Sequence, residues 1–515
     1  MNTDPPEDTP APSTSTTASG PGSVAVGRDV RDSTIITGDS NTIIIGPRPV
    51  PRKIPWRRVL LVVVPVAAIA VAAFVLYPRP VPTMNGDLNV AVAEFGALDA
   101  RGAAVQSAEA RTLADSLYNT LTGELQTINQ ASASSEHHFD IQVWGPAQVG
   151  RVDGIAPEAR AADAEQIATR GKAHLLVYGY VQSDQRSNGF VFVPQFYLRN
   201  LQDTPELQGQ HDLGRSVTVR SLDDPDSRQT LREDLKGRTR SFAEFVIGLS
   251  QFANDKFGDA RIHFEKADAD RQWDENSGGK EVLYLFLGVT AGKLDDLVAA
   301  RAYFEHALAI NPEFARAYAG LAAVQFQESI GKPNACTRAT INVSGMQSAI
   351  AGYQRALAAK VQPARSNVAS WTALGLGRAY LCLSQADAGN YWSDAERELR
   401  LVIADYDAGN ESARDFAAEA HSNLGFVLLP GRCDPDREAK YRAAAQEYQR
   451  AIDLSAFHPT RQGFYYEMLG FIDGQLGAVD QAKAAYRDAM RVDPDNRDRY
   501  QQLGQNAPPP LETCP

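Results

Sequence analysis

A short apolar pattern recurs along the C-terminal half of the chain. The stretch ARAYFEHALAINP places Ala300, Phe304 and Ala307 on one helical face and ends at Pro312. These four positions follow Gly288 by 12, 16, 19 and 24 residues. Small residues let two helices approach closely, an aromatic ring fills their contact, and proline ends the second helix. The pattern therefore predicts a packed helix pair.

The same offsets occur at two other places. Counted from Gly470, the four positions are occupied by Ala482, Tyr486, Ala489 and Pro494. Counted from Gly248, the face recurs without the proline, at Ala260, Phe264 and Ala267. A recurring helix pair indicates a solenoid, because each pair buries its apolar face only against its neighbours.

Three further helix pairs fit with longer connections inside the pair. Their facing positions are Tyr318, Leu321 and Ala322 with Ala349, Tyr353 and Ala356; Trp371, Leu374 and Gly375 with Ala395, Leu399 and Val402; and His421, Leu424 and Gly425 with Ala444, Tyr448 and Ala451. A last helix around Gly504 ends the array. These units resemble the tetratricopeptide repeat, and the resemblance implies six units and a capping helix over residues 240–506 that bind a protein or peptide.

The resemblance also implies a groove, because the first helix of each tetratricopeptide unit lines the concave side. The expected lining residues are Phe245, Leu249, Phe252, Leu285, Val289, Phe326, Leu376, Phe426, Leu429 and Phe471, with Tyr380 as a possible addition. Lys and Arg are absent from these positions, so we expect an amphipathic helix or an extended apolar peptide as the ligand. In the alternative interpretation these side chains are already covered, in the first unit by the preceding domain.

Residues 87–221 alternate between strand-like and helix-like patterns. Strands are predicted at NVAVAEF, FDIQVWG, HLLVYGYV, GFVFVPQFYLRN and RSVTVRS, and helices at EARTLADSLYNTLTGELQTI and ARAADAEQIATRG. The first helix carries leucine at every fourth position from Leu113 to Leu125. We therefore expect a compact α/β domain.

Three stretches of this domain resemble the N-terminal domain of the TolB family and its CsgG/FlgO-like relatives. They are NVAVAEFGAL, LADSLYNTLTGEL and AEQIATRGKAHLLVYGYV. The resemblance implies an assembly module of the bacterial envelope without catalytic residues.

Residues 59–77 read VLLVVVPVAAIAVAAFVLY, without a charge. This length predicts a single membrane-spanning helix in the lipid bilayer. Only Arg79 closely follows the segment, whereas Arg48, Arg52, Lys53, Arg57 and Arg58 precede it. The excess of cations predicts a cytoplasmic N-terminus and extracytoplasmic C-terminal domains in a bacterial cell membrane.

The remaining segments are short. Residues 1–21 have the composition of a disordered leader. Residues 22–46 alternate β-branched runs with Gly and Asp turns; they form either a β-solenoid rung that joins copies of the chain into a homo-oligomer or a partly ordered linker. Residues 47–58 and 78–86 are linkers, and residues 507–515 are a tail.

The net charge of −12 argues against nucleic acid as the main partner, because the acidic excess lies after residue 58. GPAQVGR lacks the Lys and Ser/Thr of a phosphate loop. The adjacent histidines of EHHFD point to opposite faces of an extended segment, which disfavours a shared metal ion. We therefore expect no enzyme activity, no cofactor and no metal site.

The four cysteines are Cys336, Cys382, Cys433 and Cys514. Tetratricopeptide geometry places all four on one edge of the solenoid, where they can oxidise outside the cytoplasm. The expected disulfides are Cys336–Cys382 and Cys433–Cys514. The other two pairings, and four free thiols, remain alternatives.

The sequence thus predicts a multidomain fold: an α/β domain followed by an all-α tetratricopeptide solenoid, preceded by one transmembrane helix and a short β-rich leader. The expected function is a membrane-anchored protein–protein interaction scaffold of the cell envelope. The alternative is a sensory receptor with an exported sensing domain and an oligomerising cytoplasmic leader.

Overall fold

The computed structural model describes residues 82–505 with several gaps, and residues 81–515 belong to one compact unit. The gaps are 100–103, 132–139, 155, 185–188, 200, 202–203, 215, 220–223, 271–278, 331–335, 361, 432–433 and 456–457. The predicted leader 22–46 and membrane segment 59–77 lie outside the described residues. Within the described part, no helix is both long and apolar enough to cross a bilayer.

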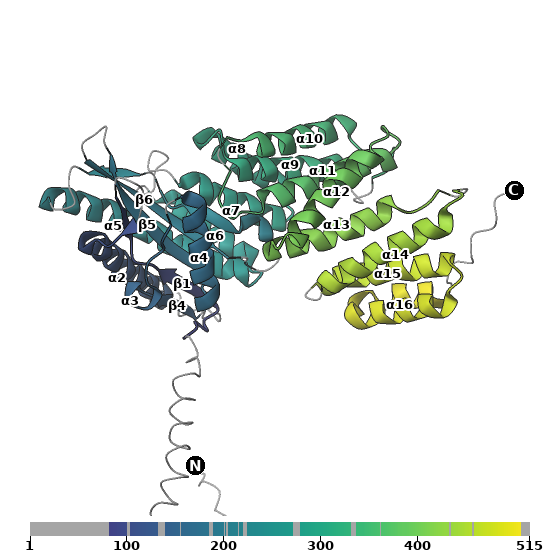
Figure 1. The fold of residues 1–515 in the computed structure, drawn as a ribbon, viewed down its shortest axis with the longest axis horizontal. Helices are drawn as coiled ribbons and strands as arrows, with labels where there is room; N and C mark the ends of the chain where they lie inside the picture. Colours follow the sequence, from purple (N-terminus) through teal and green to yellow (C-terminus); the bar gives the residue numbers. More distant parts are fainter. Residues whose placement is uncertain are drawn as a thin grey trace, which may run out of the picture. The chain divides into compact units, whose positions relative to one another are not determined.

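A mixed sheet forms the first part of the described chain (Figure 1). Its strands are β1 (Leu88–Val92), β2 (Gly96–Leu98), β3 (Ala104–Val105), β4 (Ile141–Trp144), β5 (Leu175–Asp184), β6 (Gly189–Leu198), β7 (Gly209–Asp212) and β8 (Val217–Val219). β1 runs parallel to β4 and β5, with Val90 opposite both Val143 and Leu175. β2 is parallel to β5 and antiparallel to β3, while β6 is antiparallel to β5, β7 and β8. Strand β7 is the part of the sheet that contacts the solenoid.

Helices cover both faces of the sheet. They are α2 (Ala108–Ala131), α3 (Pro146–Val149), α4 (Pro157–Gly171) and the short η1 (Pro205–Leu207). Alternate residues of β1 such as Val90 share a core with the buried leucines of α2. The intervening Ala91 packs in a second core with Ile167 of α4. This alternation is the period of two that a strand imposes.

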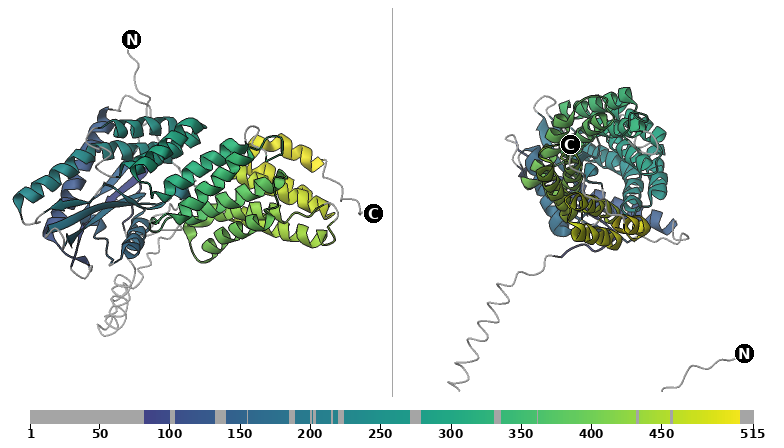
Figure 2. Two further views of the ribbon diagram at one scale, coloured as in Figure 1. Left: turned by 90° about the horizontal axis from the view of Figure 1, so that it is seen from above. Right: turned by 90° about the vertical axis from the view of Figure 1, so that its right-hand side faces the viewer.

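The second part is a helical solenoid of consecutive pairs (Figures 1 and 2). The pairs are α5 (Pro225–Ala253) with α6 (Phe257–Ala269), α7 (Lys280–Lys293) with α8 (Leu297–Ile310), α9 (Ala315–Ile330) with α10 (Val343–Ala358), α11 (Val368–Gln385) with α12 (Trp392–Asp407), α13 (Arg414–Val427) with α14 (Arg437–Leu454), and α15 (Pro459–Gln475) with α16 (Val479–Val492). Short 3-10 helices η3 (Glu411–Ala413) and η4 (Pro494–Asn496) precede α13 and the last helix, α17 (Arg497–Gln505). We number these pairs as units one to six.

The recurring offsets have a direct explanation in unit two. The buried ring of Phe304 on α8 lies against Gly288 of α7 and Gly320 of α9. A Cβ atom at these two glycines would come within 2.6 Å and 2.5 Å of the ring. The aromatic residue therefore needs glycine opposite it on both neighbouring helices.

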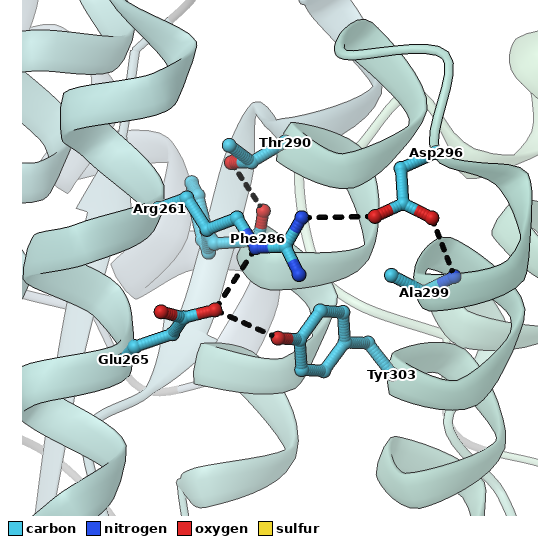
Figure 3. A network of polar contacts seen from close by, with 7 residues as sticks. All are labelled: Arg261, Glu265, Phe286, Thr290, Asp296, Ala299 and Tyr303. Atoms are coloured by element: carbon cyan, nitrogen blue, oxygen red, sulfur yellow. Dashed lines mark hydrogen bonds and ion pairs between the residues drawn. The ribbon is translucent and has the colours of Figure 1, made fainter.

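A polar network joins the second helices of units one and two (Figure 3). Arg261 of α6 donates from Nε to Glu265 at 2.9 Å and from Nη1 to Asp296 at 2.9 Å. Asp296 also accepts from the Ala299 amide at 3.1 Å and so caps α8. The hydroxyl of Tyr303 donates to Glu265 at 3.2 Å. These bonds fix the spacing between adjacent units.

The boundary between the two parts differs from the sequence prediction, which placed the α/β domain at 87–221 and the solenoid at 240–506. Helix α5 already begins at Pro225 and packs against α2 and β8 before it contributes the first helix of unit one. One apolar core also continues from Leu88 of the sheet to Val324 of α9. The sheet and the first three units therefore share their interior.

One disulfide lies within the described residues. Cys336 and Cys382 are joined, with their Cα atoms 5.0 Å apart. This bond, one of the two predicted pairs, ties the connection between α9 and α10 to α11. Cys433 and Cys514 lie outside the described residues, so their pairing stays a prediction.

Candidate functional site

The stretch from Thr204 to Asp212, which we call the bridging segment, links the sheet to the solenoid. Arg316 of α9 donates from Nη2 to the carbonyl of Gln208 at 2.7 Å and from Nη1 to that of Gln210 at 3.0 Å. The amide of Gln210 donates to the carbonyl of Ala364 at 3.1 Å. The solenoid thus holds this segment by its backbone.

A second contact joins the bridging segment to unit four. Asn367, which is buried at the start of α11, donates from Nδ2 to the carbonyl of Pro205 at 3.0 Å and to that of Ser412 at 3.1 Å. One amide group therefore links η1 of the bridging segment to the connection before α13. Backbone carbonyls are common to every peptide, so this mode of binding requires no particular side chain on the segment.

The charge of Arg316 is deeply enclosed. Its side chain is 1% exposed, and burial lowers its pKa to about 9, which leaves the guanidinium protonated at neutral pH. Nη1 also lies 3.4 Å from Nδ1 of His211. The pKa of His211 is held well below its usual range, first by burial and then by the charge of Arg316. A neutral His211 accepts at Nδ1 and donates from Nε2 to the carbonyl of Leu207 at 2.7 Å.

The bridging segment also fits the solenoid closely in shape. Gly209 has a φ of 111°, and a Cβ atom there would lie 2.6 Å from the carbonyl oxygen of Arg365 and 3.0 Å from Nη2 of Arg316. The ring of His211 stacks on Phe196 with the centroids 4.9 Å apart and lies 6.0 Å from Phe286 of α7. A side chain at Gly209 would separate the two surfaces.

Neither the bridging segment nor Arg316 is predicted from the sequence. The residues GQHD of β7 lack the alternating β-branched pattern of a strand. Arg316 is a basic residue at the start of the small and apolar run ARAYAGLAAV, which is the one local signal of its burial.

Several predicted groove residues are part of the core. Phe245, Leu285 and Phe326 are 1%, 0% and 7% exposed, so the prediction that they line an open groove is wrong. The ring of Phe245 lies 6.0 Å from Phe196 of β6 and 5.0 Å from Phe286. The predicted residues Leu249, Phe252 and Leu376 are buried as well. In unit one, the preceding α/β domain covers the predicted groove residues.

The other predicted residues are less enclosed. Tyr380 of α11, Phe426 of α13 and Phe471 of α15 are half-buried, as are Val289 and Leu429. The ring of Tyr380 stacks on Tyr391 with the centroids 5.7 Å apart. Their role in binding stays a prediction.

A charged row crosses the first helices of units four, five and six. Glu419 of α13 lies 3.7 Å from Nη1 of Arg378 on α11 and 2.6 Å from Nη1 of Arg461 on α15. The two arginine side chains are 44% exposed and Glu419 is 22% exposed. Arg378 also stands 5.1 Å above the ring of Phe326. Basic side chains are therefore present beside the apolar positions, although the groove prediction did not include them.

The end of the bridging segment lies near this row. Burial raises the pKa of Glu206 in η1, and the charges of Lys293 on α7, Glu419 and Arg461 also act on this carboxyl group.

The motifs considered for phosphate and metal are only partly described by the structure. Residues 146–149 of GPAQVGR form the short helix α3. Part of EHHFD lies in the gap at 132–139. In the described ranges, no group of three or more His, Cys, Asp and Glu residues is placed to hold a metal ion.

Comparison with known proteins identifies the repeat. Residues 282–314 and 465–496 match the family model of the tetratricopeptide repeat, so the chain contains tetratricopeptide repeats in units two and six. No curated protein matches the chain.

Several solved structures are similar to this chain at low identity, among them a tetratricopeptide protein. YrrB, described as having an unusual peptide-binding site, is 16% identical, with 47% of this chain and 97% of that one covered and a TM-score of 0.29. PilF of Pseudomonas aeruginosa is 18% identical, with 44% and 90% covered and a TM-score of 0.29. NprR, solved with its cognate peptide NprX, is 10% identical, with 54% and 76% covered and a TM-score of 0.34.

Proposed function

We propose that this chain is a membrane-anchored scaffold of the bacterial cell envelope whose solenoid binds an extended segment of a protein partner. The proposal rests on the way the solenoid binds the bridging segment. Arg316 and Asn367 hold it through the carbonyls of Gln208, Gln210 and Pro205. A solenoid that binds one extended backbone in this way has the chemistry to bind another.

We place the partner on units four to six, beside the start of the bridging segment, because the sheet shares its core with the first three units. Half-buried Tyr380, Phe426 and Phe471 offer apolar contacts there. The row of Arg378, Glu419 and Arg461 offers alternating charge. We propose that apolar side chains of the partner pack on the rings while its carboxylates meet the two arginines.

Reversing the two positive charges tests this surface. We expect the double variant Arg378→Glu and Arg461→Glu to recover about tenfold less partner than the native full-length chain in affinity capture followed by mass spectrometry. The variant places three carboxylates in a row and removes both cations. Charge reversal at exposed Arg487 of α16, Arg487→Glu, is the matched control and should leave recovery unchanged. Equal recovery from the double variant, with unchanged circular dichroism, would place binding elsewhere.

The anchoring part of the proposal rests on residues 59–77 and the five cations before them. The Cys336–Cys382 bond supports an oxidising compartment for the solenoid. The resemblance of residues 87–221 to the TolB N-terminal domain supports an envelope role. Self-association through residues 22–46 belongs to the same proposal.

A protease experiment tests the topology. In spheroplasts, we expect a tag at residue 10 to survive external protease while residues 78–515 are digested, because the cations hold the N-terminus in the cytoplasm. Detergent lysis is the control and should expose the tag. Digestion of the tag with protection of the C-terminal domains would reverse the orientation.

A further inference from the structure

The Cys336–Cys382 disulfide is attached to a helix of the proposed partner surface. Cys382 is on α11, four residues after Arg378 and two after Tyr380. Residues four apart on a helix lie on the same face, so Cys382 lies one turn along the face of Arg378. Cys336 belongs to the connection between α9 and α10. The bond therefore joins this connection to the helix that carries two residues of the partner surface.

One apolar cluster connects the disulfide to both of these residues. The cluster contains Phe326 and one of the two sulfur atoms, and Tyr391 and the other sulfur atom pack against it. Arg378 stands 5.1 Å above the ring of Phe326, and the ring of Tyr380 stacks on that of Tyr391. Two side chains of the partner surface thus rest on rings that share a cluster with the disulfide.

The connection that carries Cys336 forms a turn of its own. The amide of Ile341 donates to the carbonyl of Thr337 at 3.0 Å. The amide of Asn342 donates to the carbonyl of Ser329 at 2.7 Å, which joins the end of the turn to α9. The disulfide joins the start of the turn to α11. Breaking it removes the covalent link to α11 and leaves these hydrogen bonds in place.

The bond also closes a long loop. Cys336 and Cys382 are 46 positions apart, and the loop contains all of α10 and most of α11. A disulfide that closes such a loop restricts the unfolded chain and so favours the folded helices inside the loop. The oxidised chain therefore holds α11 in place more firmly than the reduced chain.

The two cysteines differ in exposure. Cys336 is half-buried, whereas Cys382 is 1% exposed. Thiol–disulfide exchange depends on access to the sulfur that reacts. Cys336 is therefore the residue that exchanges with a disulfide or thiol of another molecule, and Cys382 completes the internal bond.

We propose that oxidation of Cys336 and Cys382 completes the partner surface and that reduction weakens partner binding. This inference rests on the proposed function, because it concerns the surface on units four to six. During oxidation, the Cys336 thiolate attacks the disulfide of a carrier protein, and one carrier sulfur leaves. The Cys382 thiolate then attacks the Cys336 sulfur and releases the second carrier sulfur. Two electrons and the two thiol protons pass to the carrier, which becomes a dithiol.

A dithiol reductant reverses both steps and loosens the surface. A partner that binds the reduced chain must order α11 and its side chains itself, and this ordering reduces the affinity. The surface is thus complete only where the compartment keeps the bond oxidised.

Amide hydrogen exchange tests whether the bond orders α11. The full-length double variant Cys433→Ser with Cys514→Ser is used, because Cys336 and Cys382 are then its only cysteines. We expect reduction with a phosphine to speed exchange in α11 about tenfold or more and to leave α16 unchanged as the internal control. Unchanged exchange in α11 overturns the inference. So does loss of the helical circular dichroism signal, because the bond would then hold the whole fold and not one surface.

Affinity capture tests the effect on binding. The protein recovered by the native chain is measured with the oxidised and the reduced double variant. We expect about tenfold less recovery after reduction and restored recovery after treatment with oxidised glutathione. Cys336→Ser, added to the double variant, should match the reduced form without reductant.

Equal recovery by the oxidised and reduced forms overturns the inference. If the native chain recovers no partner, the proposed function fails. Hydrogen exchange in α11 then still decides whether the bond orders this surface.

Discussion

The substitution Arg316→Ala is expected to lower the free energy of unfolding by about 3–5 kcal/mol. It removes the donor to the carbonyls of Gln210, which is in β7, and of Gln208, which directly precedes that strand. Each carbonyl left unpaired in a buried place costs roughly 1–3 kcal/mol. Urea unfolding followed by circular dichroism measures the loss.

An exposed arginine provides the control. Arg442 of α14 is 68% exposed and pairs with Glu438 one turn away. We expect Arg442→Ala to cost less than about 1 kcal/mol, because exposed ion pairs contribute little. If both variants unfold at the same urea concentration, Arg316 does not hold the sheet to the solenoid.

Phe304→Ala is expected to destabilise the solenoid by about 3–5 kcal/mol. The ring fills the space between α7, α8 and α9, and Gly288 and Gly320 offer no side chain to close the resulting cavity. Thermal unfolding of the purified full-length chain measures the effect. Phe464→Ala, at a residue that is 43% exposed, should cost less than about 1 kcal/mol. Similar melting temperatures for the two variants would contradict the packing described for unit two.

The solenoid was predictable because its contacts are local. Each helix packs on the next, so the positions of Gly288, Phe304 and Pro312 recur at fixed offsets. The α/β domain was predictable to the extent that its strands alternate and its helix α2 repeats leucine. The shared core was not predictable, because an apolar face gives no indication of which partner covers it. The sequence positions of Phe245 and Phe326 therefore agreed equally well with a groove and with a core.

The bridging segment was not predictable for a different reason. Arg316 and Gln208 are separated by 108 positions in the chain, and no repeat relates them. The charged row was not predictable either, because no repeat relates its residues. Arg378, Glu419 and Arg461 stand at different distances from the reference glycines of their units, so no offset marks them as neighbours. Only the packing of the helices brings them together.

Site-specific photo-crosslinking tests most directly whether the solenoid binds a partner through units four to six. A benzophenone amino acid is placed at Phe426 or Phe471, or at Val298, which is 80% exposed on α8 of unit two. The full-length chain is irradiated in cells and its adducts are identified by mass spectrometry. The proposal predicts one shared partner protein at Phe426 and Phe471 and none at Val298. Adducts at Val298 alone, or no adduct at either phenylalanine position, would contradict it.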